Sequence, residues 1–424
     1  MLMRRVLTVC CLFWSVCLCF PAFAASAEGD ARLVRVVALA RHGVRAPTQD
    51  AATLALWSSR TWPVWPVKRA HLTPRGAELV SRMWAHLGRL WGVPGVWGVE
   101  GAQPAPGAVF VRADTDQRTR GTARALLQGL GCSQGYAVST RQRDTLFHPV
   151  KGGQYRFDAA QVSAAIAGNG ALTALRAELT GPLKLMESIA GPLGPELCRQ
   201  YGRAPGCGLA DLPDTVSLSE QGHSVGLQGG LAIASDMAEI FLLEYGQWPD
   251  RNAGWGQVDA RVLQELLPLH SRVFDLVNRA GPVAWARGSA LLAEMAAALA
   301  GNHHDPRCNA AVLTVFVGHD TNIASVGGLL GLQWQSEGFA PNEVPPGSVL
   351  LLEVWQKRRQ REIRPRFFSL PLDMLHAADL PAAALSALEP VAAGKSLGLE
   401  AFGRQVRRLI AGAPLAPQER PAVR

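Results

Sequence analysis

After residue 24 the sequence lacks any apolar run that we would expect to cross a membrane. Its one long apolar run, residues 6–20, follows Arg4 and Arg5 and precedes Ala22-Phe23-Ala24. A basic start, a short apolar core and a small-residue A-x-A site are typical of a secretory signal peptide, and this core is too short for a comfortable membrane span. We therefore predict that residues 1–24 are a signal peptide, with a second candidate cleavage site after Ala27. The mature protein is expected to be soluble, without a membrane partner, and periplasmic or secreted.

Cysteine is scarce in the rest of the chain, and its spacing matches no common zinc site. Four of the eight cysteines lie in the leader, and the other four are Cys132, Cys198, Cys207 and Cys308. An exported protein reaches an oxidising compartment, and four cysteines allow three pairings. Because Cys198 and Cys207 flank a short segment that contains glycine and proline, we predict a disulfide between them. A bond between Cys132 and Cys308 stays open.

Acidic residues are fewer than basic ones, which sets the charge of the protein. The 42 lysines and arginines against 34 acids give a net charge of +8, which loss of Arg4 and Arg5 lowers to +6. A modest positive charge suits an anionic ligand, although it also serves ordinary solubility. The basic residues of segment 357–361 are predicted to form a solvated hairpin tip, so we expect no nucleic-acid partner.

The hydrophobic content of 48% and charged content of 18% describe a globular chain with a large core. Both ends of the chain repeat a pattern of short apolar strand, polar turn and helix, whereas the middle shows helical periodicity without strand signals. The expected helices of the middle are 158–167, 171–189, 222–246, 259–278 and 287–299. The predicted fold class is therefore α/β, with an α/β domain of residues 28–150 and 302–424 and a helical insertion of residues 151–301.

The stretch 33–48, LVRVVALARHGVRAPT, combines a buried strand with a cluster of cations. Arg41, His42 and Arg45 follow directly where the apolar run ends. Arginine offers a planar fork that fits phosphate oxygens, and a histidine between two such forks is suited either to bind phosphate or to attack phosphorus. Taken alone, the tripeptide RHG also fits a solvated loop.

Two further apolar strands end in polar turns of the same kind. Residues 108–111 lead into a turn that contains Arg118, and residues 311–317 lead into His319 and Asp320. In open α/β sheets, ligands bind outside the carboxyl ends of the strands. We therefore expect these turns and the one after the first strand to meet in one pocket.

Such a pocket has the residues that phosphoryl transfer needs. Fixed cations can surround the non-bridging oxygens of a phosphoryl group without a metal or other cofactor. His42 would attack phosphorus, kept neutral by the nearby positive charge and held in one tautomer by a hydrogen bond from its other ring nitrogen. Asp320 would protonate the leaving alcohol and then activate the water that cleaves the phosphohistidine. A carboxylic acid in that role must be protonated, which predicts activity at acidic pH.

The motif R-H-G-x-R-x-P at residues 41–47, together with the distant His319-Asp320 pair, resembles the histidine acid phosphatases, the branch with bacterial periplasmic phytases and glucose-1-phosphatases. The resemblance extends over nearly the whole mature chain, through segments 62–68, 72–76, 113–120, 254–256, 318–322 and 345–347. It implies a phosphoglycerate-mutase-like three-layer α/β domain with an inserted helical domain, a pocket between them, and a monomer. It also implies site roles: catalysis by His42 and Asp320, and phosphate binding by Arg41, Arg45, Arg118 and His319.

Substrate preference is suggested by smaller features. Thr48, which the resemblance implies in substrate binding, and the sequence HDTN at 319–322 are more similar to the phytases than to the glucose-1-phosphatases. Gln49 and the segments 236–239 and 270–273 depart from the phytase pattern. We expect a phytase-like phosphomonoesterase acting on inositol or sugar phosphates; a glucose-1-phosphatase-like or broad-specificity acid phosphatase is the alternative.

Other classes fit the motifs less well. A phosphoglycerate mutase shares the RHG chemistry, but it is cytosolic and does not use an H-D acid. The D-x-D of Asp114 and Asp116 would fit a magnesium-dependent haloacid-dehalogenase phosphatase, except that Arg118 stands where that motif needs threonine or valine. A non-catalytic phospho-ligand binding protein would need the arginines but not both His42 and Asp320. The His303-His304-Asp305 cluster could hold a metal, although a polar loop is favoured, and we expect no metal in the site.

Overall fold

The computed structural model describes residues 31–92 and 104–412, so the predicted signal peptide lies outside the described residues. At its centre is a mixed sheet with the strand order β10-β8-β7-β1-β6-β2-β3, and β9 pairs with β8. The strands β1, β6, β2 and β3 are parallel, whereas β7 runs antiparallel to β1 and β8 antiparallel to β7. Their bounds are β1 Ala31–Arg41, β2 Val109–Ala113, β3 Ala137–Val138, β6 Leu313–Gly318, β7 Val349–Lys357, β8 Gln360–Phe368, β9 Val391–Ala392 and β10 Leu397–Gly398.

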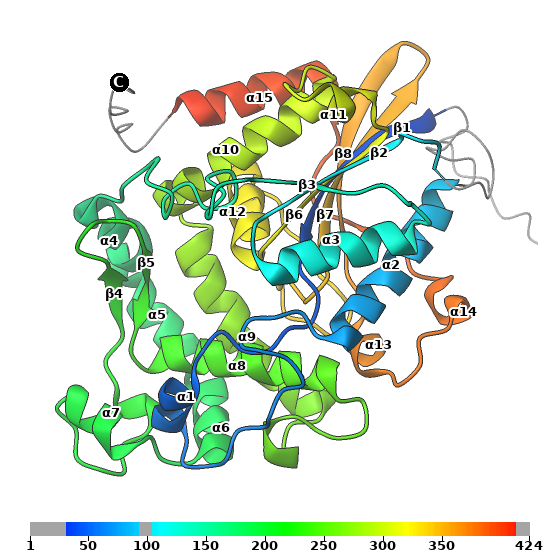
Figure 1. The fold of residues 1–424 in the computed structure, drawn as a ribbon. Helices are drawn as coiled ribbons and strands as arrows, with labels where there is room; N and C mark the ends of the chain where they lie inside the picture. The colour runs from blue at the N-terminus through cyan, green and yellow to red at the C-terminus, as the bar shows by residue number, and fades with distance from the viewer. Residues whose placement is uncertain (1–30, 93–103, 413–424) are drawn as a thin grey trace, which may run out of the picture.

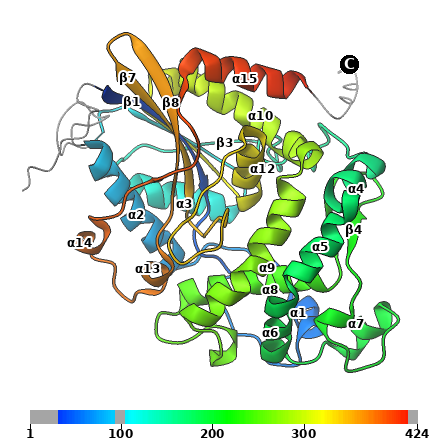
Figure 2. The same ribbon diagram turned by 180° about the vertical axis from the view of Figure 1, so that it is seen from behind.

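Helices cover both faces of this sheet, which gives three layers (Figures 1 and 2). Alternate residues of β1 point to opposite faces, as the pleat requires. Val36, Ala38 and Ala40 join the core under α2 (Pro74–Gly92) and α3 (Gln117–Gly129). Val37 and Leu39 join the core under α10 (Gly281–Ala300), α12 (Asp320–Leu330) and α15 (Leu399–Ala411). Because β1 is covered on both faces, its sequence is a continuous apolar run rather than an alternating one.

The second part of the molecule is mostly helical and lies below the sheet in Figure 1. Its helices are α1 Ala51–Trp57, α4 Ala159–Ala167, α5 Ala171–Glu178, α6 Thr180–Ala190, α7 Pro195–Gln200, α8 Gly230–Gln247 and α9 Ala260–Asn278. The remaining short helices are α11 Pro306–Ala310, α13 Leu372–His376 and α14 Ala382–Leu385. The α/β fold class with helical segments is thus confirmed, while the boundaries at residues 151 and 301 stay a prediction.

Two expectations for the middle of the chain were wrong. Segment 222–246 is not one helix, because β4 (Thr215–Leu218) and β5 (Val225–Gln228) form an antiparallel hairpin, and α8 begins only after Gly229, whose φ is +110°. Segment 171–189 is two helices that meet at Leu179. Pro182 explains this break, since it has no N–H to donate to the carbonyl of the preceding turn.

The expectation about membrane spans also needs correction. The helix α10 is long and apolar enough to cross a membrane by length and composition. It packs against β1, α12 and α15 instead, and 61% of its most apolar window is buried inside the protein. Its apolar character is therefore that of a core helix.

The predicted disulfide between Cys198 and Cys207 is present, and it joins the end of α7 to the following loop. The pairing of Cys132 with Cys308, which the sequence left open, is not formed, because both cysteines are free. Cys308 is buried, with its Sγ 3.4 Å from the hydroxyl of Thr314. The predicted hairpin tip at 357–361 is confirmed as the exposed turn between β7 and β8.

We expect the variant Cys198→Ser to lose about 2–3 kcal/mol of unfolding free energy, because the bond closes a loop with a sequence separation of 9 in the unfolded chain. Urea unfolding of oxidised and reduced protein measures this loss. The free thiol variant Cys132→Ser is the control and should unfold like the wild type. Identical urea midpoints for oxidised wild type and Cys198→Ser would contradict the expectation.

Candidate active site

Three distant segments meet at one cavity of about 230 Å³ at the carboxyl ends of the parallel strands. His42 follows β1, His319 follows β6, and Arg118 lies in the first turn of α3 after β2. The cavity is lined by His42, Arg45, Thr48, Arg118, Phe147, His148, Pro149, Val150, Lys151, His223, Arg287, His319, Asp320, Thr321 and Asn322. The structure thus brings together all of the predicted site residues except Arg41, which lies directly behind the cavity wall.

The imidazole of His42 is buried and held in one orientation. Its Nδ1–H donates to the carbonyl oxygen of Gly43 at 2.9 Å, which leaves the lone pair on Nε2. Burial, and then the charges of Arg118, Arg45 and Arg41, hold the pKa of His42 well below 6.5. These charges favour the neutral ring, with its lone pair on Nε2.

Gly43 is required here by close packing. A Cβ at this position would lie 2.6 Å from the carbonyl oxygen of Gly76, and the N–H of Gly43 donates to the hydroxyl of Thr122 at 3.1 Å. The turn that carries His42 is thereby fixed against α2 and α3. A rigid turn of this kind keeps the imidazole of His42 in place.

Arg41 and Arg45 share one carboxylate that the sequence analysis did not single out as a site residue. Glu239 of α8 forms ion pairs with both guanidiniums, and its distance to Arg45 is 2.9 Å. Arg41 is fully buried and also lies 2.9 Å from Oδ2 of Asp320. A glutamate inside the apolar run of α8 was the signal for this pairing, since a buried charge needs a partner.

The predicted arginines have donors that the protein itself does not use. The Nε atoms of Arg41, Arg45 and Arg118 are buried, and within the described residues none of the three has a hydrogen-bond partner. Buried polar groups in proteins are normally paired. Two of these donors belong to Arg45 and Arg118, which line the cavity, and they indicate that its ligand is an anion with several oxygens.

His319 is oriented by a second residue whose role the sequence analysis missed. Oδ2 of the buried Asp114 accepts from Nε2 of His319 at 2.7 Å and from Nε2 of His148 at 2.9 Å. The other nitrogen of His319, Nδ1, lies 3.3 Å from the guanidinium of Arg118. Since Asp114 is committed to two imidazoles and does not line the cavity, the haloacid-dehalogenase interpretation of the D-x-D is wrong.

Asp320 begins α12 at the floor of the cavity. Burial by itself would raise the pKa of Asp320, but the guanidiniums of Arg41 and Arg45 outweigh burial and lower this pKa to about 2. The carboxyl is therefore ionised before substrate binds. A phosphate that neutralises these arginines would remove part of this stabilisation of the carboxylate and raise the pKa.

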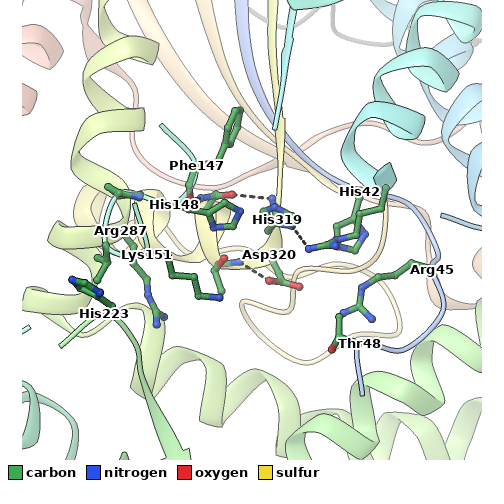
Figure 3. A pocket seen from close by; sticks show the side chains of 15 residues that line it. His42, Arg45, Thr48, Phe147, His148, Lys151, His223, Arg287, His319 and Asp320 are labelled. Atoms are coloured by element: carbon green, nitrogen blue, oxygen red, sulfur yellow. Dashed lines mark hydrogen bonds between the residues drawn. The ribbon is translucent and has the colours of Figure 1, made fainter. Parts of the chain in front are cut away.

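Additional cations line the side of the cavity away from His42. In Figure 3 Lys151, His223 and Arg287 lie on one side of Asp320, and His42, Arg45 and Thr48 lie on the other. Burial, followed by nearby arginines, lowers the pKa of Lys151. The guanidinium of Arg287 is held by the carbonyl of Val225 at 2.9 Å. The sequence analysis did not find these residues, because they come from segments expected to be plain loop or helix.

The cluster around His303 is a structural polar loop. The N–H of Asp305 donates to Nδ1 of His303 at 3.0 Å, so the ring proton lies on Nε2, which is 2.6 Å from Glu294. A nitrogen that carries a proton has no lone pair for a metal. The polar-loop interpretation is thus the one that the hydrogen bonds favour.

Comparisons with known proteins agree with this geometry. The sequence model of the histidine phosphatase superfamily (branch 2) matches residues 32–174 and 246–369. The chain is 34% identical over 351 residues to phytase AppA of Escherichia coli (strain K12), a match that covers 79% of each chain. It is 27% identical to the glucose-1-phosphatase of Salmonella typhimurium, over 76% of this chain and 77% of that one.

A solved structure shows the same architecture. The phytase of Hafnia alvei, without ligand, superposes with a TM-score of 0.81 at 32% identity, over 92% of this chain and all of that one. Its complex with myo-inositol hexakis sulphate gives a TM-score of 0.78 at 31% identity, with the same coverage. The fold and the family therefore rest on both sequence and structure.

Proposed function

Because the chain belongs to branch 2 of the histidine phosphatase superfamily and is a phytase-like histidine acid phosphatase, we propose that it releases phosphate from inositol phosphates through a phosphohistidine on His42. The observation that carries the proposal is the neutral His42, whose free Nε2 faces a cavity lined by Arg45, Arg118 and His319. An imidazole held in this way can attack phosphorus while the surrounding cations neutralise the charge on the phosphoryl oxygens.

The reaction would proceed in two displacements. In the first, Nε2 of His42 attacks phosphorus and the P–O bond to the alcohol breaks, while Asp320, which has taken up the proton of the bound phosphate monoanion, passes that proton to the leaving oxygen. In the second, Asp320 takes a proton from water, and the hydroxide displaces His42 from phosphorus. Arg45, Arg118 and His319, which line the cavity, would bind the phosphoryl oxygens through both steps, and Arg41 would add its positive charge from behind the wall.

Inositol phosphates are favoured as substrates by the surplus of positive charge. One phosphoryl group is already matched by the three arginines and His319. Lys151 and Arg287 line the same cavity on the opposite side, where further phosphates of a polyphosphorylated ring would lie. Thr48 is exposed at the wall beside Arg45 and would contact the ring or its substituents.

We propose that the enzyme acts as a monomer in the periplasm or outside the cell. A disulfide bond persists in oxidising compartments, and the bond between Cys198 and Cys207 therefore supports export. No cofactor is needed for this chemistry, since the charge is supplied by fixed side chains.

A substrate panel at acidic pH tests the proposal. Released phosphate is measured with inositol hexakisphosphate, glucose 1-phosphate and an aryl phosphate, each with and without EDTA. We expect the highest kcat/KM with inositol hexakisphosphate and no loss with EDTA. A preference for glucose 1-phosphate would favour the glucose-1-phosphatase alternative. Binding of the three compounds without hydrolysis of any would instead indicate a non-catalytic phospho-ligand binding protein.

A further inference from the structure

His148 has a position in the cavity that the mechanism above does not use. Its ring lies beside that of His319, with centroids 5.0 Å apart, and the ring of His42 lies 5.6 Å from that of His319. Figure 3 shows the three imidazoles in sequence across the cavity, with His319 in the middle. His148 therefore lies on the far side of His319 from His42.

One ring nitrogen of His148 is used in a hydrogen bond within the protein, and the other is available to a ligand. Nε2 donates to Oδ2 of the buried Asp114 at 2.9 Å. Its Nδ1 has no hydrogen-bond partner among residues 31–92 and 104–412, and 23% of the side chain is exposed where it lines the cavity. A protonated ring in this position would donate to Asp114 on one side and to an anion in the cavity on the other.

The loop that carries His148 is fixed on both sides, so the ring is presented rigidly. Asp144, four residues earlier, pairs with Arg112 of β2 at 2.6 Å. The side-chain amide of Asn322 in α12 donates to the carbonyl of Phe147 at 2.9 Å. A side chain held by such contacts loses little freedom when it binds a ligand, which favours binding.

A basic side chain from the same loop accompanies His148. Lys151 follows it by three residues, lines the same cavity, and supplies a positive charge to an anion bound there.

We propose that His148 is a further phosphate-binding residue, whose Nδ1 holds a second phosphate of the substrate beside the one that reacts at His42. The inference rests on the proposed function and names the site through which a polyphosphorylated substrate is preferred over a monophosphate. The ligand class is a vicinal bis- or polyphosphate ester.

The test compares inositol hexakisphosphate with 4-nitrophenyl phosphate, which has no second phosphate. For His148→Asn we expect KM for inositol hexakisphosphate to rise about tenfold or more, since a charge-assisted hydrogen bond is lost. Kinetics with 4-nitrophenyl phosphate should stay within about twofold.

Two variants separate binding from positioning. In His148→Gln the side-chain amide can still donate to Asp114 but cannot carry a charge, so the rise in KM should remain. His304→Asn, an exposed histidine outside this cavity, is the control and should change neither substrate. If His148→Asn loses activity equally on both substrates and His148→Gln restores it, His148 has a positioning role through Asp114. If the kinetics of His148→Asn are unchanged, His148 has no role. Either result overturns the inference, whereas failure of the wild type to hydrolyse either substrate would instead overturn the proposed function.

Discussion

Replacing His42 with alanine is expected to lower kcat/KM by about 10⁴-fold or more on every phosphomonoester, because no other group can form the covalent intermediate. Burial and the charges of Arg118 and Arg45 favour the neutral ring of His42, whose Nε2 is free, whereas the two nitrogens of its neighbour His319 contact Asp114 and Arg118. Phosphate release with an aryl phosphate, the most easily cleaved ester, gives the most sensitive measurement.

The fold should survive this change, since His42 lies at the wall of a cavity rather than inside the apolar core. Circular dichroism and urea unfolding check that the variant is folded. His86→Ala is a matched control: His86 is also buried, and its Nε2 bonds to the carbonyl of Leu388, far from the cavity. That variant should lose stability and keep its kcat. A folded His42→Ala protein with wild-type turnover would exclude the mechanism.

Replacing Asp320 with asparagine is expected to slow hydrolysis according to the leaving group. Alkyl esters such as inositol phosphates need a proton on the departing oxygen and should lose about 10²–10⁴-fold in kcat/KM, which reports the first displacement. Aryl phosphates leave as stable phenolates, and their loss in the first step should be much smaller. Asparagine keeps the shape of the side chain but cannot supply the proton. The measurement is a plot of log kcat/KM against leaving-group pKa for a series of esters, which should become steeper in the variant.

The pH dependence follows from the same groups. Burial and the neighbouring arginines hold the pKa of His42 well below its ordinary value, which favours the neutral ring that the proposed attack needs. Asp320, with a pKa of about 2 before substrate binds, is ionised at pH 5, so the proton for the leaving group must enter with the phosphate monoanion. Activity should therefore decline as pH rises through about 6, where a phosphate monoester loses its second proton.

The control for Asp320→Asn is Asp379→Asn, because Asp379 is an exposed acid. Equal losses of Asp320→Asn on alkyl and aryl esters would remove Asp320 from the acid role.

The meeting of the site residues could be predicted because each one follows a strand or begins a helix at the same edge of the sheet. His42 and His319 directly follow the parallel neighbours β1 and β6, so local sequence placed them correctly. Arg118 required only the further step that β2 pairs with β6.

The partners of these residues could not be predicted in the same way. Glu239 reaches Arg41 and Arg45 from α8, almost 200 residues away in sequence, and nothing in the local pattern of α8 specifies which cations it meets. Asp114 was noticed only as part of a D-x-D, and its two imidazole partners come from a loop and from the turn after β6. The β4–β5 hairpin was missed because β5 is short and lies directly before α8, so its residues were read as the start of that helix. Tertiary packing, and not the local sequence, makes this segment a strand.

The central claim is that phosphate passes through a covalent bond to His42, and trapping that intermediate tests it most directly. Asp320→Asn protein is mixed with a radiolabelled aryl phosphate, quenched in alkali, digested, and the labelled peptide identified by mass spectrometry. The account predicts an acid-labile, alkali-stable phosphate on the peptide that contains His42. Label on any other residue, or turnover of the aryl ester without label under conditions that preserve phosphohistidine, would contradict it.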